Sequence, residues 1–542
     1  MLAAPGAPTA LLGPFVRRRE FILAGLVTAI VAALVLAIGP APGDAPAHLY
    51  RTLLVRDGIF VWDNFWYAGN YPLASYSLLY YLPAALVGNL PLVFAAAVVS
   101  TMLFVSIALR EWGKAALWPS RAFGVLAAAP VYTGLYSYTL GFAAMLAALK
   151  ALQLRRTWLA IVCAALTVGF SPLAFAFLCL ILAAFVRPRI WRRTLPIFAG
   201  LIAIGGVEAA VLTLFPSPGV YPFHAIDFAG VIAVTTLGAL VARRAPGGRP
   251  LVAFYALWGL GSVIVFAVPS PLGDNWTRLS AFVFPLMLIT AALADFRPRR
   301  LVLLALATAL AYNLTPYLLL IPYRLDGRPA KAAFWQPAIE FLQRHPATGF
   351  RVEVVPTSAH WESYWIPRAG FPLARGWYRQ LDETDNPQLF SKHLGPAVYR
   401  RWLRANAVRY VLLPATELDA TGGPQEANVL HSPKSGLRVV FRSSSWTIYQ
   451  LPHATPLVTG PGRARVTWFG HTTISGRVSS PGRYLLRAHY NPYWSISGSG
   501  CVGRGPARMT WLQLPSAGAF TIRVPNGPVG LIAGANSHQS RC

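Results

Sequence analysis

The sequence predicts a mainly α-helical protein that crosses a membrane many times and ends in a region of mixed α/β and β structure. Of its 542 residues, 55% are hydrophobic and only 12% are charged, and long apolar runs recur up to about Pro322. Such runs are typical of polytopic membrane proteins. From about Ala330 the composition shifts to Pro, Arg, Trp, Ser and Gly, with short alternating segments that indicate strands.

The basic residues indicate how the chain is threaded through the membrane. A net charge of +28 would suggest nucleic-acid binding in a soluble protein, but here the basic clusters are short and lie between apolar runs. This placement is typical of loops on the cytoplasmic side of a membrane. The clusters are residues 17–19, 110 with 114, 155–156, 187–193, 243–249 and 297–300.

Placing residues 17–19 in the cytoplasm predicts about eleven spans and sends the chain after Tyr323 outside. The first run follows three arginines, but its length and the nearby Pro40 and Pro42 favour a retained helix over a cleaved signal peptide. Around Pro172 the spans are short, so a bent hairpin or a re-entrant pair is an alternative. The predicted spans are residues 21–38, 90–109, 115–131, 138–152, 158–170, 173–186, 195–215, 228–241, 251–268, 279–294 and 301–321.

Three domains follow from this reading: a transmembrane domain over residues 1–325, an extracytoplasmic α/β domain over 326–455 and an extracytoplasmic β-sandwich over 456–542. In the α/β domain we expect strands at 350–355, 409–413, 437–442 and 446–451, and helices at 333–344 and 396–406. Cys501 and Cys542 can form a disulfide if the compartment is oxidising.

The first external loop opens with "GDAPAHLYR", which contains three ionisable side chains. Asp44, His48 and Arg51 are spaced i, i+4 and i+7, so a helix over residues 45–56, ending at Gly58, places them on one face. Asp44 could equally be an ordinary N-cap before Ala45-Pro46, and the basic pair could be solvated or interfacial. The same loop also contains Asp63, and the other predicted outer loops add His224, Asp227, Asp274 and Arg278.

These features resemble the GT-C class of membrane glycosyltransferases: an acidic first outer loop, many spans, basic inner loops and a C-terminal outer domain. The stretch "GDAPAHLYRTLLVRDGIFVWDNFWYAGNYPLASYSLLYYLPAAL" resembles bacterial membrane proteins labelled as related to 6-pyruvoyl-tetrahydropterin synthase. The segment from "FRVEVVPT" to "RYVLLP" is similar to membrane proteins of the YfhO type. The zinc-binding histidine pattern of such a synthase is not found in the sequence.

The resemblance implies an inverting transferase that moves a sugar from a polyprenyl-phosphate donor to a glycan, glycolipid or protein acceptor on the outer face of the cell membrane. Asp44 would be the general base, and a nearby cation would stabilise the leaving phosphate. That cation is Arg51, Arg278 or a divalent ion, Mg²⁺ or Mn²⁺, held by Asp44 and Asp63. Many GT-C enzymes carry two adjacent acids in this loop, and Asp44 has no such neighbour. The residues expected to contact the donor are His48, Arg51, Asp63, His224, Asp227, Asp274 and Arg278.

The outer domain contains the aromatic and charged stretches "HWESYW" and "LARGWYRQLD". Such mixtures contact sugars, but they also occur in ordinary domain packing. The residues predicted to contact the acceptor are His360, Trp361, Glu362, Arg375 and Trp377. The alternative to an enzyme is a non-catalytic lipid or polymer transporter, or a scaffold that binds glycan. The outer-loop placement of the acids, with Glu208 as an exception within the spans, favours surface chemistry over conduction. Membrane lipid is an expected partner and nucleic acid is not.

Overall fold

A computed structural model describes residues 12–39, 41–73, 76–185, 191–216, 219–320, 326–526 and 542. The chain forms two compact units: Met1–Ala45, Tyr76–Leu214 and Gly219–Leu325 make up unit 1, and Pro46–Ser75, Phe215–Pro218 and Asp326–Cys542 make up unit 2. The segment that follows Ala45 therefore folds with residues from the second half of the sequence. The basic residues 187–190 and the predicted boundary at 325 lie outside the described residues.

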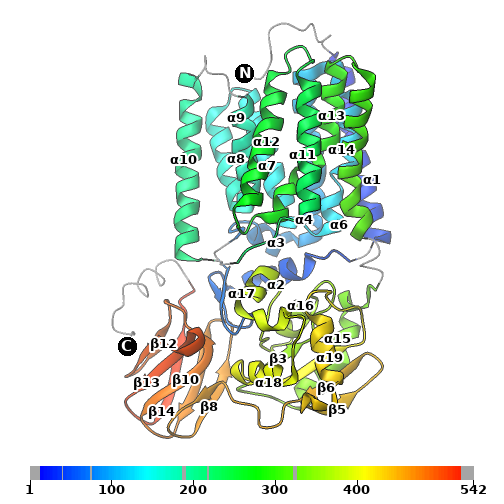
Figure 1. The fold of residues 1–542 in the computed structure, drawn as a ribbon. Coiled ribbons are helices and arrows are strands. Elements are labelled where there is room, and N and C mark those ends of the chain that lie inside the picture. The colour runs from blue at the N-terminus through cyan, green and yellow to red at the C-terminus, as the bar shows by residue number, and fades with distance from the viewer. Residues whose placement is uncertain are drawn as a thin grey trace. The chain divides into compact units, whose positions relative to one another are not determined.

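Unit 1 is a bundle of helices, drawn from blue to green in Figure 1. Its helices are α1 (Pro14–Ile38), α3 (Tyr81–Val87), α4 (Asn89–Trp112), α5 (Leu117–Leu126), α6 (Ala129–Thr133), α7 (Tyr136–Gln153), α8 (Thr157–Phe170), α9 (Pro172–Phe185), α10 (Trp191–Leu214), α11 (Ala225–Ala242), α12 (Arg249–Ala267), α13 (Ser280–Leu293) and α14 (Arg299–Leu320). Short 3₁₀ segments η2 (Gly113–Ala116) and η4 (Gly273–Leu279) precede α5 and α13.

Six helical segments among the described residues are long and apolar enough to cross a membrane, which indicates a membrane protein. Two further apolar helices, α8 and α9, have 14 residues each. At 1.5 Å per residue they are about 21 Å long, shorter than the roughly 30 Å of a bilayer core. The predicted count of eleven spans therefore stays a prediction. The six segments are Pro14–Ile38, Asn89–Thr133, Leu195–Leu214, Ala225–Ala242, Arg249–Ala267 and Gly273–Leu293.

Small and polar side chains join helices inside unit 1. The Thr28 hydroxyl on α1 lies 2.8 Å from Thr101 Oγ1 on α4 and 2.8 Å from the carbonyl oxygen of Gly124 on α5. A Cβ atom on Gly124 would lie 2.9 Å from the Ala24 carbonyl oxygen, so glycine is needed where α1 and α5 approach each other. Close approach at small residues, with hydroxyl hydrogen bonds across the contact, is typical of helix packing in membranes.

One end of unit 1 is built from loops that are far apart in the sequence. The Asp44 N–H donates to the Thr133 carbonyl oxygen, the Asp274 N–H to Pro222, and the Tyr138 hydroxyl to Arg278. We call this end, formed by residues 41–45, 133–138, 219–224 and 270–279, the Asp44 end. The predicted threading of the chain places all of these loops on the outer side of the membrane.

Unit 2 begins at Pro46, within α2 (Ala45–Arg56). This helix confirms the predicted one and its end before Gly58, whose φ is +74°. Strands β1 (Trp62–Asp63) and β2 (Tyr71–Pro72) follow. The α/β part contains a sheet with the order β3-β4-β6-β5, in which β3 and β4 run parallel. Its elements are α15 (Ala332–Arg344), β3 (Arg351–Val354), α16 (Glu362–Arg368), α17 (Arg379–Asp385), α18 (Pro396–Ala405), β4 (Val408–Pro414), α19 (Gly423–His431), β5 (Arg438–Arg442) and β6 (Trp446–Gln450), with 3₁₀ segments η6 (Arg328–Ala330), η7 (Pro387–Phe390) and η8 (Pro433–Ser435). The four predicted strands and two predicted helices of this part are confirmed.

The C-terminal part of unit 2 is a β-sandwich of two four-stranded antiparallel sheets (Figure 1). The sheets have the orders β12-β13-β10-β7 and β11-β14-β9-β8. A disulfide joins Cys501 to Cys542, with the Cα atoms 5.1 Å apart. The strands are β7 (Val458–Thr459), β8 (Ala464–Phe469), β9 (Thr473–Val478), β10 (Gly482–His489), β11 (Ser495–Ser497), β12 (Cys501–Arg504), β13 (Met509–Leu514) and β14 (Gly518–Arg523), with η9 (Pro506–Arg508).

Candidate functional site

The Asp44 end of unit 1 places Asp44 beside Arg278, although 234 positions separate them in the sequence. Arg278 Nη2 lies 3.9 Å from Asp44 Oδ2, and both side chains are about one quarter exposed. Gly134 holds the loop around Asp44, because its φ of +88° suits glycine and a Cβ atom there would lie 2.9 Å from the Asp44 nitrogen. Backbone contacts thus fix a carboxylate next to a guanidinium at a surface that solvent reaches.

The η4 segment that carries Arg278 also carries Asp274, which belongs to a second polar group. The backbone N–H of His224 donates to Asp274 Oδ1 at 2.8 Å, and the His224 ring pairs with Asp274 Oδ2. Potential ligand atoms of His224, Asp227 and Asp274 all lie within 4.8 Å of one another. Imidazole and carboxylate groups suit Mn²⁺ or Zn²⁺. Asp227 also suits the first turn of α11, where an acid interacts favourably with the helix dipole.

The other predicted donor contacts, His48, Arg51 and Asp63, belong to unit 2. His48 and Arg51 are buried, and the Arg51 guanidinium donates to the carbonyl oxygen of Leu73. The helix predicted from "GDAPAHLYR" is therefore present. Arg51, however, is buried and binds the backbone of the loop at Leu73, which belongs to the same unit.

Asp63 is fully buried, and both of its oxygen atoms have partners. The Tyr50 hydroxyl donates to Oδ2 at 2.9 Å, and Oδ1 lies 2.7 Å from His471 Nδ1. Burial, and next the charge of Asp63, raises the pKa of Tyr50 well above its ordinary value. The Phe65 ring stacks on His471, with ring centroids 4.0 Å apart. Asp63 thus acts as a structural acceptor, and its oxygens are already occupied where a metal ion would need them.

His471 was not among the residues predicted from the sequence. It lies in the turn between β8 and β9, and 408 positions separate it from Asp63. It is a single histidine in a turn rich in Thr and Gly, and no sequence pattern around it indicates a contact with Asp63. The Asn64 N–H also donates to the His471 carbonyl oxygen at 2.8 Å, so the pair joins the first loop to the sandwich within unit 2.

Arg375 is the centre of a buried ionic cluster in the α/β part. Its guanidinium Nη2 lies 2.6 Å from Asp382 Oδ2, its Nη1 lies 3.5 Å from Glu353 Oε1, and it pairs with Glu426. The Tyr399 hydroxyl donates to Glu426 Oε2 at 2.9 Å. Burial, together with the repulsion between neighbouring carboxylates, raises the pKa values of Glu353 and Glu426. Burial opposes the charge of Arg375, but its three carboxylates outweigh this and raise its pKa.

His360 lies between two carboxylates beside this cluster. Its Nδ1 lies 3.0 Å from Glu362 Oε1, and its Nε2 lies 3.5 Å from Asp419 Oδ2. Burial lowers the pKa of His360, but the bonds to Asp419 and Glu362 are stronger and raise it to about 9. His360 is therefore protonated at neutral pH, and it neutralises part of the buried negative charge.

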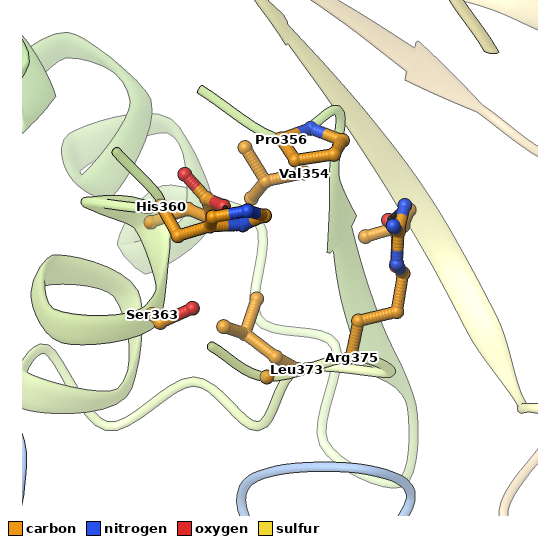
Figure 2. Close-up of a pocket in the computed structure, with 9 residues that line it drawn as sticks. Val354, Pro356, His360, Ser363, Leu373 and Arg375 are labelled. Atoms are coloured by element: carbon orange, nitrogen blue, oxygen red, sulfur yellow. Dashed lines mark hydrogen bonds and ion pairs between the residues drawn. The ribbon is translucent and has the colours of Figure 1, made fainter. Parts of the chain in front are cut away.

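A small void lies between His360 and Arg375, which reach it from opposite sides (Figure 2). Glu353, Glu362 and Leu373 also line it, whereas Trp361 and Trp377 do not. It has room for about one water molecule. A pocket for a small-molecule ligand usually has about 300 Å³ or more. Of the residues predicted to contact the acceptor, His360, Glu362 and Arg375 are therefore charge-pairing groups around a space that is too small for a sugar ring in this conformation.

We expect Arg375→Leu to destabilise unit 2 by about 3–5 kcal/mol, because three buried carboxylates would lose their shared cation. Chemical unfolding of the full-length protein in detergent, followed by tryptophan fluorescence, measures this. The exposed pair of Arg344 and Glu340 provides the control, and Arg344→Leu should cost less than about 1 kcal/mol. Equal effects of the two substitutions would contradict the assignment.

The raised pKa of His360 predicts a loss of stability at alkaline pH. The folded-state pKa of about 9 lies above the ordinary value of 6.5, so this contribution is complete below pH 6.5 and is lost as the pH rises through 9. The loss should reach about 3 kcal/mol. His360→Gln should remove this pH dependence, whereas the exposed His431→Gln should keep it. A wild-type stability that is flat from pH 6 to 10 would show that the imidazole is not held in its charged form.

Comparison of the sequence with protein-family models and with curated proteins finds no match.

Proposed function

We propose that the protein is a membrane glycosyltransferase that takes a sugar from a polyprenyl-phosphate donor. The observation that carries this proposal is the pairing of Asp44 with Arg278 at the Asp44 end, where both side chains are partly exposed. Sugar transfer from a lipid phosphate needs a base for the acceptor and positive charge for the leaving group. This pair supplies both from one bundle of apolar helices.

In the proposed reaction, the acceptor hydroxyl oxygen attacks the anomeric carbon of the donor. Asp44 takes the hydroxyl proton as the new carbon–oxygen bond forms. The bond between the anomeric carbon and the phosphate oxygen breaks, and the polyprenyl phosphate leaves with the electron pair. The Arg278 guanidinium stabilises the charge that develops on this phosphate. A single displacement of this kind inverts the configuration at the anomeric carbon.

The location of the site suits a donor with a lipid tail. The tail stays in hydrocarbon while the sugar phosphate reaches the headgroup zone, so a site on loops at one end of a helix bundle meets both requirements. The proposal takes the Asp44 end to be the outer face of the cell membrane, because the basic clusters lie in the alternate loops. It includes the eleven spans, the GT-C class, the cell-envelope acceptor and an extracytoplasmic C-terminal region.

A divalent cation in this proposal would be held by His224, Asp227 and Asp274. Asp63 is a poor ligand because its oxygens are buried and occupied, and so the predicted pair of Asp44 and Asp63 is not retained. The spacing and chemistry of the His224 group fit Mn²⁺. When bound, such an ion would add positive charge close to the donor phosphate.

We expect Asp44→Asn to lower transfer by about 10²–10⁴-fold, because the amide cannot accept the proton. The measurement is transfer of labelled sugar from a panel of polyprenyl-phosphate donors to membrane acceptors. Asn also caps a helix about as well as Asp, so the melting temperature should stay unchanged. Arg278→Gln should lower transfer by about 10²-fold or more.

Asp295→Asn provides the matched control, because Asp295 is an exposed acid outside the Asp44 end that pairs with Arg297 at 3.6 Å. Transfer by this variant should equal that of the wild type. If Asp44→Asn retains near-normal transfer, Asp44 is not the base. If the wild type moves lipid across liposome membranes and transfers no sugar, the alternative of a non-catalytic transporter replaces the proposal.

The cation assignment predicts that the purified protein binds Mn²⁺ and that His224→Ala weakens this binding by about tenfold or more. Electron paramagnetic resonance of free Mn²⁺ measures the affinity without any need for transfer. Asp63→Asn is the control, and it should leave Mn²⁺ affinity unchanged because Asp63 lies in a separate hydrogen-bonded group. If Asp63→Asn weakened Mn²⁺ binding and His224→Ala left it unchanged, the assignment of the site to the His224 group would be wrong.

A further inference from the structure

The C-terminal part of the chain contains no acidic side chain. Glu426 is the last Asp or Glu in the sequence, and the β-sandwich segment from residue 456 onward carries arginines alone as its permanent charges. These arginines can therefore pair only with acids from other parts of the chain, as Arg508 does with Asp385, and an arginine without such a partner attracts anions. These arginines are residues 463, 465, 477, 483, 487, 504, 508, 523 and 541.

Strand pairing collects three of these arginines on the outward face of the sheet β11-β14-β9-β8. Burial alternates along β9 and β14: Ile474, Gly476, Phe520 and Ile522 face the core, and the residues between them face outward. The outward residues form three cross-strand rows. These rows are Arg465-Arg477-Ala519, Trp468-Ser475-Thr521-Ser497 and Thr473-Arg523-Ser495.

Arg465 and Arg477 lie directly opposite each other on β8 and β9. Like charges in this arrangement are destabilising in the free protein, since opposed Cβ atoms are only about 5 Å apart. Both side chains are exposed, and neither forms an ion pair with an acid among the described residues. An anion placed between the two guanidinium groups would remove this repulsion.

Trp468 is the large apolar side chain of these rows, and it is 62% exposed. It lies one row from the arginine pair, opposite Ser475. Its neighbours are hydroxyl groups, and Ser475 Oγ and Thr521 Oγ1 lie 2.9 Å apart. An open indole ring with hydroxyls and guanidinium groups beside it suits a ligand that has both flat apolar faces and many polar groups.

We propose that this face, Arg465, Trp468, Ser475, Arg477, Thr521 and Arg523, binds an anionic polysaccharide. A sugar ring stacks on Trp468, the hydroxyls exchange hydrogen bonds with the serine and threonine side chains, and the carboxylates or phosphates of the polymer pair with the arginines. A lipid surface suits the face less well, because one exposed indole gives little apolar area to insert. The inference does not depend on the proposed sugar transfer.

The test titrates detergent-solubilised full-length protein with polygalacturonate, a polymer of uronic acid, and follows binding by thermophoresis. Neutral dextran of similar length should not bind, and rising salt should weaken binding of polygalacturonate. Trp468→Ala should raise the Kd about tenfold or more, and the double variant Arg465→Gln with Arg477→Gln should do the same. The double variant should melt no earlier than the wild type, because it removes a repulsive pair.

Arg483→Gln with Arg504→Gln is the matched control, because it removes the same charge from the other sheet. Its Kd should stay within about twofold of the wild type. An equal loss in this control would overturn the proposal, since net charge alone would then explain binding. The proposal would also be overturned if Trp468→Ala left the Kd for polygalacturonate unchanged. The same holds if anionic phosphatidylglycerol vesicles or single-stranded DNA bound as tightly as polygalacturonate. Because the assay needs no transfer, its outcome is independent of the tests of Asp44.

Discussion

The structure of both units depends on how ionised side chains are paired when they are removed from water. A buried charge without a partner is strongly destabilising, so each buried acid requires a donor or a cation close by. In unit 1 the buried Glu20 accepts from Arg121 at 2.7 Å, which joins α1 to α5. In unit 2 Arg375 serves three carboxylates, and Asp63 accepts from Tyr50. These pairs join separate elements within each unit.

The ionic cluster of the α/β part stabilises a segment of the chain that has little regular secondary structure. Between the end of β3 and the start of α17 the backbone forms turns around the short helix α16, and this stretch supplies both His360 and Arg375. Their partners Asp382, Asp419 and Glu426 come from later segments. Backbone bonds such as those of Val352 with Pro372 and Ala374 fix part of its path, and charge pairing fixes the side chains of His360 and Arg375. This explains why aromatic and charged residues are mixed there, a pattern that sugar-binding surfaces share.

Much of the secondary structure could be predicted from the sequence, and much of the side-chain convergence could not. Apolar runs interrupted by basic clusters mark the helices of unit 1, and alternation in stretches such as residues 446–451 marks strands of unit 2. The pairing of Arg278 with Asp44 agrees with the expectation that a cation such as Arg278 lies near Asp44. By contrast, the local spacing of residues does not predict the pairing of Asp63 with His471, which lie 408 positions apart. Local spacing also does not predict that residues 46–75 fold with the second half of the chain. Periodicity indicates which face of an element is apolar, but not which distant element packs against it.

The two acids of the predicted first loop show how burial decides the chemistry that a carboxylate can perform. Asp63 has no exposed surface and both of its oxygens are engaged, so an acceptor hydroxyl cannot approach it. Asp44 retains about a quarter of its side-chain surface, and it lies beside the guanidinium of Arg278. A proton acceptor must come within about 3 Å of the hydroxyl it deprotonates. Of these two residues only Asp44 has the exposed side-chain surface that such an approach requires, and so accessibility distinguishes two acids that the sequence places in the same predicted loop.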